Sequence, residues 1–231
     1  MIRDKGIKGV VLSGGSELDA TVPLYKFSDT IRKIKDEFNL TINAHTGPVN
    51  RKQAREIVNA GLDCAMVDVI GSKETIKSIL NLDFTPQDIG NAMKFLQREG
   101  IKNLSPHLIV GLDHCRLKGE WKAIKILHKI NLDNIVIVVI IPTPGTEFQN
   151  LKPPPVEDIS SLISEIRIKF PTTHISLSCV RPGGSYRNKL DEIALRSGVN
   201  KIAIPSKTAF DTAKELGLKI KVYGENRCCS W

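Results

Sequence analysis

Aromatic residues, long apolar runs and a disulfide framework are all scarce in this 231-residue chain. Aromatic side chains make up only 5% of it and none is interleaved with a basic patch, which argues against nucleic-acid binding. The longest apolar run, at 135–142, is far too short to cross a bilayer. The five cysteines show no secreted-type spacing, and residues 1–8 are charged where a signal peptide would be apolar. These absences predict a cytoplasmic protein with no nucleic-acid or membrane partner.

The excess of positive charge is modest and dispersed. Lysine and arginine number 33 against 25 acidic residues, which gives a formal net charge of +8. The basic residues are spread along predicted helices, as at Lys122 and Lys125. Such spacing is typical of a solvated face, with an anionic ligand or an acidic protein partner as the alternative. Since no linker divides the chain, the sequence predicts a single domain over 1–231 that ends in a short tail at 224–231.

Short apolar runs alternate with helical patterns along the whole chain, and Gly, Pro, Asn or Thr mark the joints. Some runs are apolar on both faces, as at 135–141, which is typical of buried parallel strands. The alternation predicts an α/β fold, either a βα-barrel or an open parallel sheet. Strands are predicted at 8–12, 41–45, 64–69, 106–111, 134–141, 174–179 and 201–204, with a last short one at 219–223. Helices are predicted at 24–38, 51–60, 73–80, 86–99, 120–130, 156–170, 189–197 and 206–216, with N-caps at Asn50 and Thr85.

Small and polar residues follow nearly every predicted strand. In parallel α/β folds, ligands bind at the edge where the strands reach their carboxyl ends. The segments at that edge are 13–17, 45–47, 68–72, 111–114, 142–146, 181–184 and 205–206. Bare structural turns would not need so much polar chemistry on one rim. The rim therefore predicts an anionic or zwitterionic ligand.

The pair Gly14-Gly15 resembles the glycine pair by which radical S-adenosylmethionine enzymes hold the amino group of the cofactor's methionine. Glycine suits that contact because no Cβ blocks the approach of a ligand to the backbone. Members of that family usually carry Glu next, whereas here Ser16 precedes Glu17. Taken alone, the pair also fits an ordinary tight turn.

The order of the later motifs carries the resemblance along almost the whole chain. The segment 106–112, followed by Gly119-Glu120, resembles the strand and turn beside the adenine in that family, which implies that Gly111 contacts the cofactor. The segment 141–146 resembles a strand end of biotin and lipoyl synthases and contains Thr143. The segment 175–181 resembles the biotin synthase strand that ends in a barrel-facing arginine, here Arg181.

Three further features together resemble the two-protein lipoyl synthase of archaea. They are Arg181-Pro182, the run Ala203-Ile204-Pro205, and the adjacent pair Cys228-Cys229. The resemblance implies S-adenosylmethionine and a 4Fe–4S cluster as cofactors, and a homologous second subunit or a lipoyl-domain protein as partner.

The chain differs from the family in its N-terminal part, where the cluster-binding cysteines are expected. Family members hold the cluster with three cysteines spaced CxxxCxxC, so that one iron stays open for the methionine end of the cofactor. No such spacing occurs here, because Cys64, Cys115 and Cys179 are isolated. The seven predicted main strands are also one short of a complete barrel. We therefore expect an incomplete parallel βα-barrel whose first strand and cluster segment are missing, with an open edge through which copies of the chain could associate.

Each candidate residue has a functional and a structural interpretation. His45 and Asp68, with Gly14, Gly15, Ser16 and Gly111, are predicted to bind the cofactor, although His45 also fits a hydrogen-bonded rim histidine. Asp68 interrupts an apolar strand, so its carboxylate needs a partner or a wet cavity. Arg181 and Thr143 are predicted to contact substrate or an auxiliary cluster, with a plain salt bridge as the alternative for Arg181. Cys228 and Cys229 are candidate ligands of an auxiliary cluster, or part of a tail with no role.

Three functions follow from these features. The first is a radical enzyme of the sulfur-insertion type, which the family resemblance implies. The second is a clusterless, non-catalytic partner or binding barrel. The third is a conventional phosphate-binding βα-barrel enzyme, since Gly183-Gly184-Ser185 before a helix would suit phosphate. An in-frame CxxxCxxC in the DNA upstream of Met1 would favour the first over the second.

Overall fold

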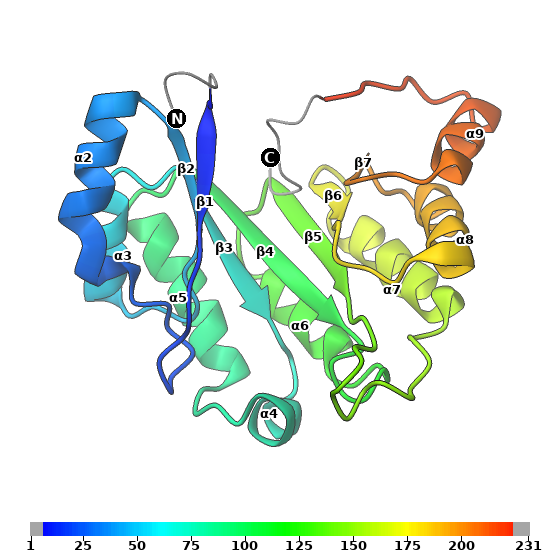
Figure 1. The fold of residues 1–231 in the computed structure, drawn as a ribbon, viewed down its shortest axis with the longest axis horizontal. Helices are drawn as coiled ribbons and strands as arrows, with labels where there is room; N and C mark the ends of the chain where they lie inside the picture. Colours follow the sequence, from blue (N-terminus) through cyan, green and yellow to red (C-terminus); the bar gives the residue numbers. More distant parts are fainter. Residues whose placement is uncertain (1–6, 224–231) are drawn as a thin grey trace.

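One curved sheet of seven parallel strands forms the centre of the molecule (Figure 1). The computed structural model describes residues 7–223. The strands pair in the order in which they occur in the chain, so each one lies beside its neighbours in sequence. They are β1 Gly9–Leu12, β2 Thr41–His45, β3 Cys64–Val69, β4 Asn103–Val110, β5 Asn134–Val139, β6 His174–Leu177 and β7 Lys201–Ile202.

Helices cover the outer, convex side of the sheet, and the inner side is concave (Figure 1). A 3₁₀ turn η1 (Leu24–Phe27) leads into α2, and a short π-helical turn η2 (Ile76–Leu80) follows α4. No helix in the described range 7–223 is long and apolar enough to cross a membrane. The α-helices are α2 Ser28–Phe38, α3 Arg51–Asn59, α4 Lys73–Thr75, α5 Pro86–Arg98, α6 Glu120–Leu127, α7 Val156–Lys169, α8 Gly184–Arg196 and α9 Lys207–Glu215.

The expected incomplete parallel βα-barrel is confirmed. β1 and β7 form the two edges of the sheet and do not pair with each other. The additional strand predicted at 219–223 is wrong, since this segment has no strand pairing. Its lysines, Lys219 and Lys221, alternate with apolar residues and imitate a strand pattern, but no sheet edge is bonded to them.

Local sequence signals explain where several helices begin. The side chain of Asn50 accepts from the backbone N–H of Gln53, and Gln53 returns the bond in a capping box. Thr85 and Asp88 form the same arrangement at α5, with Pro86 at the first helical position. The start of α8 was predicted wrongly: the helix starts at Gly184, five residues before the predicted 189, without a side-chain cap. Because no capping side chain precedes Gly184, no local signal marks this start.

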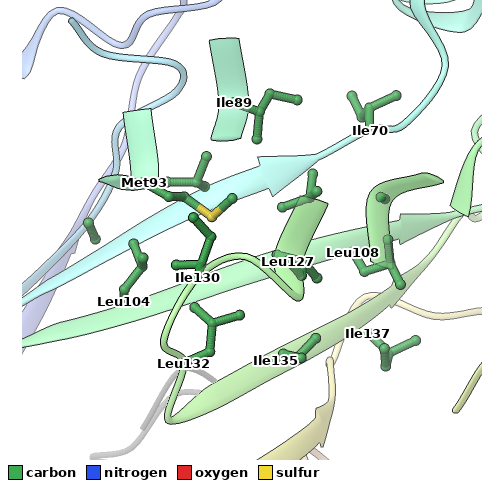
Figure 2. Packing of buried hydrophobic residues seen from close by; sticks show 14 of the residues in the cluster. Ile70, Ile89, Met93, Leu104, Leu108, Leu127, Ile130, Leu132, Ile135 and Ile137 are labelled. Carbon is green, nitrogen blue, oxygen red and sulfur yellow. The ribbon is translucent and has the colours of Figure 1, made fainter. Parts of the chain in front are cut away.

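The hydrophobic core lies between the sheet and the helices, as Figure 2 shows around Met93 of α5, Leu127 of α6 and Leu108 of β4. Ile135 and Ile137 of β5 point into the same layer and are fully buried. Burying one such side chain contributes about 1.5–3 kcal/mol. Since this layer takes every second residue of each strand, the other residues face the concave side.

Glycine allows one very close backbone approach in this layer. A Cβ on Gly71, which follows β3, would lie 2.0 Å from the carbonyl oxygen of Gly119 and 2.5 Å from the amide nitrogen of Ala123. Gly119 precedes α6 and has a φ of 110°, a conformation that favours glycine. The turn after β3 is therefore locked against the N-terminus of α6.

Candidate functional site

The polar side chains of the sheet lie on its inner face, whereas the outer face is apolar. Along β2, Ile42 and Ala44 pack into the core, which leaves Asn43 and His45 on the inner face. The same alternation places Asp68 on that face in β3 and His107 in β4. We call these side chains the inner-face residues: Asn43, His45, Asp68, Ser105, His107, Asn134 and Ser176.

Strand register joins part of the inner face into a hydrogen-bonded network. The amide nitrogen of Asn134 donates to the hydroxyl of Ser105 over 2.9 Å, across β4 and β5. The hydroxyl of Ser176 donates to the amide oxygen of Asn134 over 2.7 Å, across β5 and β6. Buried polar groups need such partners. The network therefore holds the middle of the concave face polar and rigid.

A cavity of about 390 Å³ opens at the carboxyl ends of β1, β2 and β3. Its polar wall includes Ser13, Gly14 and Ser16 from the loop after β1, with His45 and Asp68 beside them. Its apolar lining includes Leu80, Leu82 and Phe84. Small-molecule sites typically combine an apolar wall with a few converging polar groups.

Asp68 lies between two imidazoles on the inner face. Its Oδ1 is 4.0 Å from Nδ1 of His45 and 3.6 Å from Nδ1 of His107, and the two rings are 5.2 Å apart between centroids. Burial is the largest influence on His45 and lowers its pKa; Asp68 opposes that effect and His107 adds to it. His45 therefore stays neutral near pH 7, because its ordinary pKa is already about 6.5.

Four of the predicted cofactor-binding residues converge on the cavity. Gly14, Ser16, His45 and Asp68 all line it. A Cβ on Gly14 would meet only Val22 Cγ1, at 4.0 Å, so the backbone there is open to a ligand. Gly15 lies beside these residues in sequence but does not line the cavity.

Glu17, which follows Ser16, has its carboxylate bonded to other side chains of the protein. Glu17 accepts a 2.6 Å hydrogen bond from Lys26 and a 3.3 Å bond from the hydroxyl of Tyr25. Ser16 separates the glycine pair from Glu17, and the Glu17 carboxylate binds neighbouring side chains of the protein. This pairing ties the loop after β1 to the start of the first helical segment.

Gly111 does not line the cavity. Its N–H donates to Oε1 of Glu120 over 2.9 Å, and its φ is 82°. A Cβ there would lie 2.4 Å from Cγ of Pro154. In this structure, Gly111 therefore permits close packing at the end of β4.

Glu120, the partner of Gly111, is 4% exposed. Burial raises the pKa of its carboxyl group, Asp113 raises it further, and the N–H of Gly111 opposes both. The folded protein consequently holds the Glu120 proton to a higher pH than the unfolded chain does. The resulting stability is fully present below the ordinary Glu pKa and is lost as pH rises through the raised pKa.

Glu120→Gln should remove this pH dependence, because the amide stays neutral and keeps an oxygen for the Gly111 N–H. Denaturant unfolding at a series of pH values from about 4 to 8 should show wild-type stability falling relative to the variant as pH rises. Glu157→Gln is the control, since Lys189 lowers the pKa of exposed Glu157 and the variant should not reproduce the effect. Parallel curves for wild type and Glu120→Gln would contradict the assignment.

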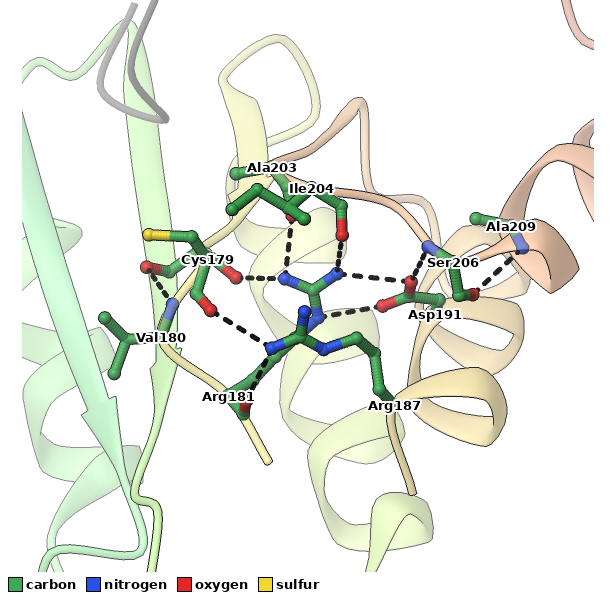
Figure 3. A network of polar contacts seen from close by, with 10 residues as sticks. Cys179, Val180, Arg181, Arg187, Asp191, Ala203, Ile204, Ser206 and Ala209 are labelled. Atoms are coloured by element: carbon green, nitrogen blue, oxygen red, sulfur yellow. Dashed lines mark hydrogen bonds and ion pairs between the residues drawn. The ribbon is translucent and has the colours of Figure 1, made fainter. Parts of the chain in front are cut away.

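Arg181 is fully buried and its guanidinium is occupied by protein groups (Figure 3). Nε and Nη2 donate to the two carboxylate oxygens of Asp191 over 2.9 and 3.2 Å. Nη1 donates to the carbonyls of Ser178 and, over 2.8 Å, Ala203, while Nη2 also reaches the carbonyl of Ile204 over 3.1 Å. In this structure Arg181 forms the salt bridge that was the alternative to contact with a ligand, and its bonds join the segment after β6 to α8 and to the segment after β7.

The remaining candidates lie away from the cavity or outside the described residues. Thr143 is exposed after β5, and its hydroxyl donates to the carbonyl of Ile141 over 2.9 Å. Gly183 and Gly184 are exposed at the start of α8. Cys228 and Cys229 fall outside residues 7–223.

His107 is the inner-face residue that sequence reasoning did not single out. It belongs to the segment 106–112, where it alternates with the core residue Leu108 and shares a face with Ser105. Its register partner in β3 is Asp68. The signal was therefore the pairing of a histidine and an aspartate at equivalent places in two consecutive apolar strands.

Fold and site together define a class: a parallel βα half-barrel with a polar concave face and a cavity at the carboxyl ends of its first strands. The solved structures of methylornithine synthase (PylB) and of HydG, the FeFe-hydrogenase maturase from Carboxydothermus hydrogenoformans, share this fold. PylB matches with a TM-score of 0.65 and 15% identity over 94% of this chain and 69% of its own. HydG matches with a TM-score of 0.62 and 17% identity over 87% of this chain and 48% of its own.

The relatives found by sequence are more specific. A biotin synthase from Coxiella burnetii (strain Dugway 5J108-111) is 28% identical over 89% of this chain and 66% of its own length. One from Vesicomyosocius okutanii subsp. Calyptogena okutanii (strain HA) is 28% identical over 58% of this chain and 42% of its own. This chain thus spans less than two thirds of the length of these relatives, and no family model matches it. The sequence relatives and the shared fold together support a biotin synthase-like member of the radical S-adenosylmethionine superfamily.

The superfamily implies S-adenosylmethionine and a 4Fe–4S cluster. The cysteines of the described residues do not fit the cluster. Cys64 is buried at the start of β3, Cys115 is buried in the loop after β4, and Cys179 is exposed after β6. Three thiolates on one loop are needed, and these three lie on separate segments. Within 7–223, the cysteines therefore do not fit the cluster.

Proposed function

We propose that this chain is the cofactor- and substrate-binding core of a radical enzyme of the sulfur-insertion type, similar to biotin or lipoyl synthase. The observation that carries the proposal is the cavity, in which residues from the ends of three strands converge beside an exposed glycine backbone. The sequence similarity to a biotin synthase over 89% of the chain supports the same function.

The cavity residues suit the parts of a zwitterionic nucleoside ligand. The open backbone at Gly14 and the hydroxyls of Ser13 and Ser16 offer polar contacts to its charged end. The carboxylate of Asp68 and the neutral imidazole of His45 offer an acceptor and a donor to hydroxyl groups.

The apolar part of the cavity lining suits a reaction that requires water to be kept out. Leu80, Leu82 and Phe84 supply an apolar wall that excludes water on one side. S-adenosylmethionine, when bound to a complete enzyme of this kind, supplies the carbon radical that removes hydrogen from an unactivated C–H bond. This chain's own residues bind, orient and exclude water; no side chain in the proposal acts as an acid or base.

Calorimetric titration with S-adenosylmethionine tests the proposal. Binding to the wild-type chain should be weak, because the cluster ligands are not among the described residues. Asp68→Ala should lower the remaining affinity about 10–100-fold, which is the effect of losing one hydrogen bond to a charged group. Asp113→Ala, which removes a carboxylate outside the cavity, is the matched control and should bind as the wild type does. Equal affinity of wild type and Asp68→Ala would contradict the proposal.

The separated cysteines favour a second candidate, a clusterless partner or binding subunit. Such a protein would use the same cavity without generating a radical, beside a homologous catalytic subunit or a lipoyl-domain protein. Anaerobic reconstitution followed by iron and sulfide analysis separates the two. A 4Fe–4S cluster that cleaves S-adenosylmethionine supports the enzyme, and binding without a cluster supports the partner.

A further inference from the structure

We propose that His45, Asp68 and His107 form a binding site for one divalent transition-metal ion on the inner face. The proposal rests on the positions of three side chains in neighbouring strands and does not depend on the proposed function. One ligand atom from each residue lies within 4.8 Å of those of the other two.

The separations suit ligands of one ion better than hydrogen-bonded partners. The 3.6 Å and 4.0 Å distances from the Asp68 carboxylate to the two Nδ1 atoms exceed the length of a hydrogen bond. Metal–ligand bonds of about 2.0–2.2 Å place two ligand atoms of a tetrahedral ion about 3.4 Å apart. Rotation of Asp68, whose side chain is 56% exposed, would shorten its separations from the two imidazoles. The ligand atoms of His45 and His107, within 4.8 Å of each other, would have to approach as well.

The backbone fixes the ligands on rigid elements. Asp68 and His107 are register partners in adjacent strands, so their side chains project side by side from the same face. His45 is the register partner of Met66, two residues before Asp68, and therefore approaches the carboxylate diagonally. Sites built on strands hold their geometry more accurately than sites built on loops.

The ligand set indicates the kind of ion. Two imidazoles and one carboxylate are the protein ligands of catalytic zinc sites and of non-haem iron(II) sites, both of which keep open positions for water or another ligand. His45 and Asp68 line the cavity, so the open positions would face it. His107 is 7% exposed in its side chain and closes the site from the side of the sheet.

A second histidine–carboxylate cluster provides a matched control. Nδ1 of His114 is 3.8 Å from Asp113, and Nε2 of the same ring is 3.8 Å from Glu147. The two carboxylates therefore meet opposite edges of one imidazole, and all three residues lie on loops. This cluster has similar residue types and distances, but its two carboxylates lie near different nitrogens of the ring, so one ion would not contact both of them and the imidazole.

Titration of chelator-treated full-length protein with Co²⁺ tests the proposal, with visible absorption as the readout and Zn²⁺ competition followed by calorimetry. The experiment uses the background Cys179→Ser, Cys228→Ser, Cys229→Ser, which removes the exposed thiol and the terminal cysteine pair. One equivalent should bind, without the near-ultraviolet charge-transfer band of a thiolate. Asp68→Asn and His107→Gln should each weaken binding at least about tenfold, since even outer partners of metal ligands cost that much.

His114→Gln should bind Co²⁺ as the background protein does. Asp68→Asn changes an exposed side chain and should keep the fold, which circular dichroism checks, so the test stands even if His107→Gln unfolds. The proposal is overturned if no one-to-one complex forms, if Asp68→Asn binds as tightly as the background protein, or if His114→Gln causes the same loss.

Discussion

Replacing Arg181 with alanine is expected to lower the free energy of unfolding by about 3–5 kcal/mol, the usual cost of removing one partner of a buried ion pair. The carboxylate of Asp191 is fully buried and would lose both of its guanidinium bonds. The carbonyls of Ser178, Ala203 and Ile204 would lose their donor at the same time. Guanidinium unfolding followed by circular dichroism measures the change.

Arg196→Ala is the matched control for this prediction. Arg196 lies on the same helix, α8, and pairs with Glu192 and Glu215 at the surface, so its removal should change stability little. Arg181→Ala combined with Asp191→Ala should lose less than the sum of the two single losses, because neither charge is then left unpaired. Additive losses would show that the two side chains do not act as a pair.

Gly71→Ala is expected to destabilise the protein by about 3 kcal/mol, at the upper end of the usual range for overpacking. The new Cβ would meet the backbone of Gly119 and Ala123, and backbone cannot move aside as a flexible side chain can. The turn after β3 would have to shift away from α6 and would carry the end of β3 with it. Calorimetric melting and urea unfolding both measure the loss.

Gly15→Ala serves as the control for Gly71→Ala. A Cβ at Gly15 would meet nothing within 4 Å, and Gly15 is not among the residues with positive φ. Its melting temperature should stay within the range of ordinary surface substitutions. A small loss for Gly71→Ala, equal to that for Gly15→Ala, would mean that the turn and α6 are not locked together.

Periodicity was sufficient to predict the sheet but not the ends of every element. The apolar run at 135–141 predicted β5, yet the strand stops at Val139, just before the segment that leads to Pro142. The segment at 219–223 has a strand-like pattern and is not paired, because a strand requires a partner edge and a local pattern cannot supply one.

The candidate site was predictable where it depended on strand ends and not where it depended on partners. Gly14, His45 and Asp68 line one cavity because parallel strands end along one edge, and their contact with a cofactor stays a prediction. Arg181 also follows a strand, but its direction is set by Asp191, ten residues later in α8, and no pattern in the sequence identifies that partner. His107 required knowledge of the register between β3 and β4.

The strictly sequential strand order also affects how the chain folds as it leaves the ribosome. Every parallel pair joins strands that are consecutive in the chain, so the pairings have a low contact order for a parallel sheet. By the time Val110 has been synthesised, β1 to β4 and the helices α2, α3 and α5 that cover them are complete. Within the described residues, the first four strands can therefore pair while β5 to β7 are still being translated at about 5–20 residues per second.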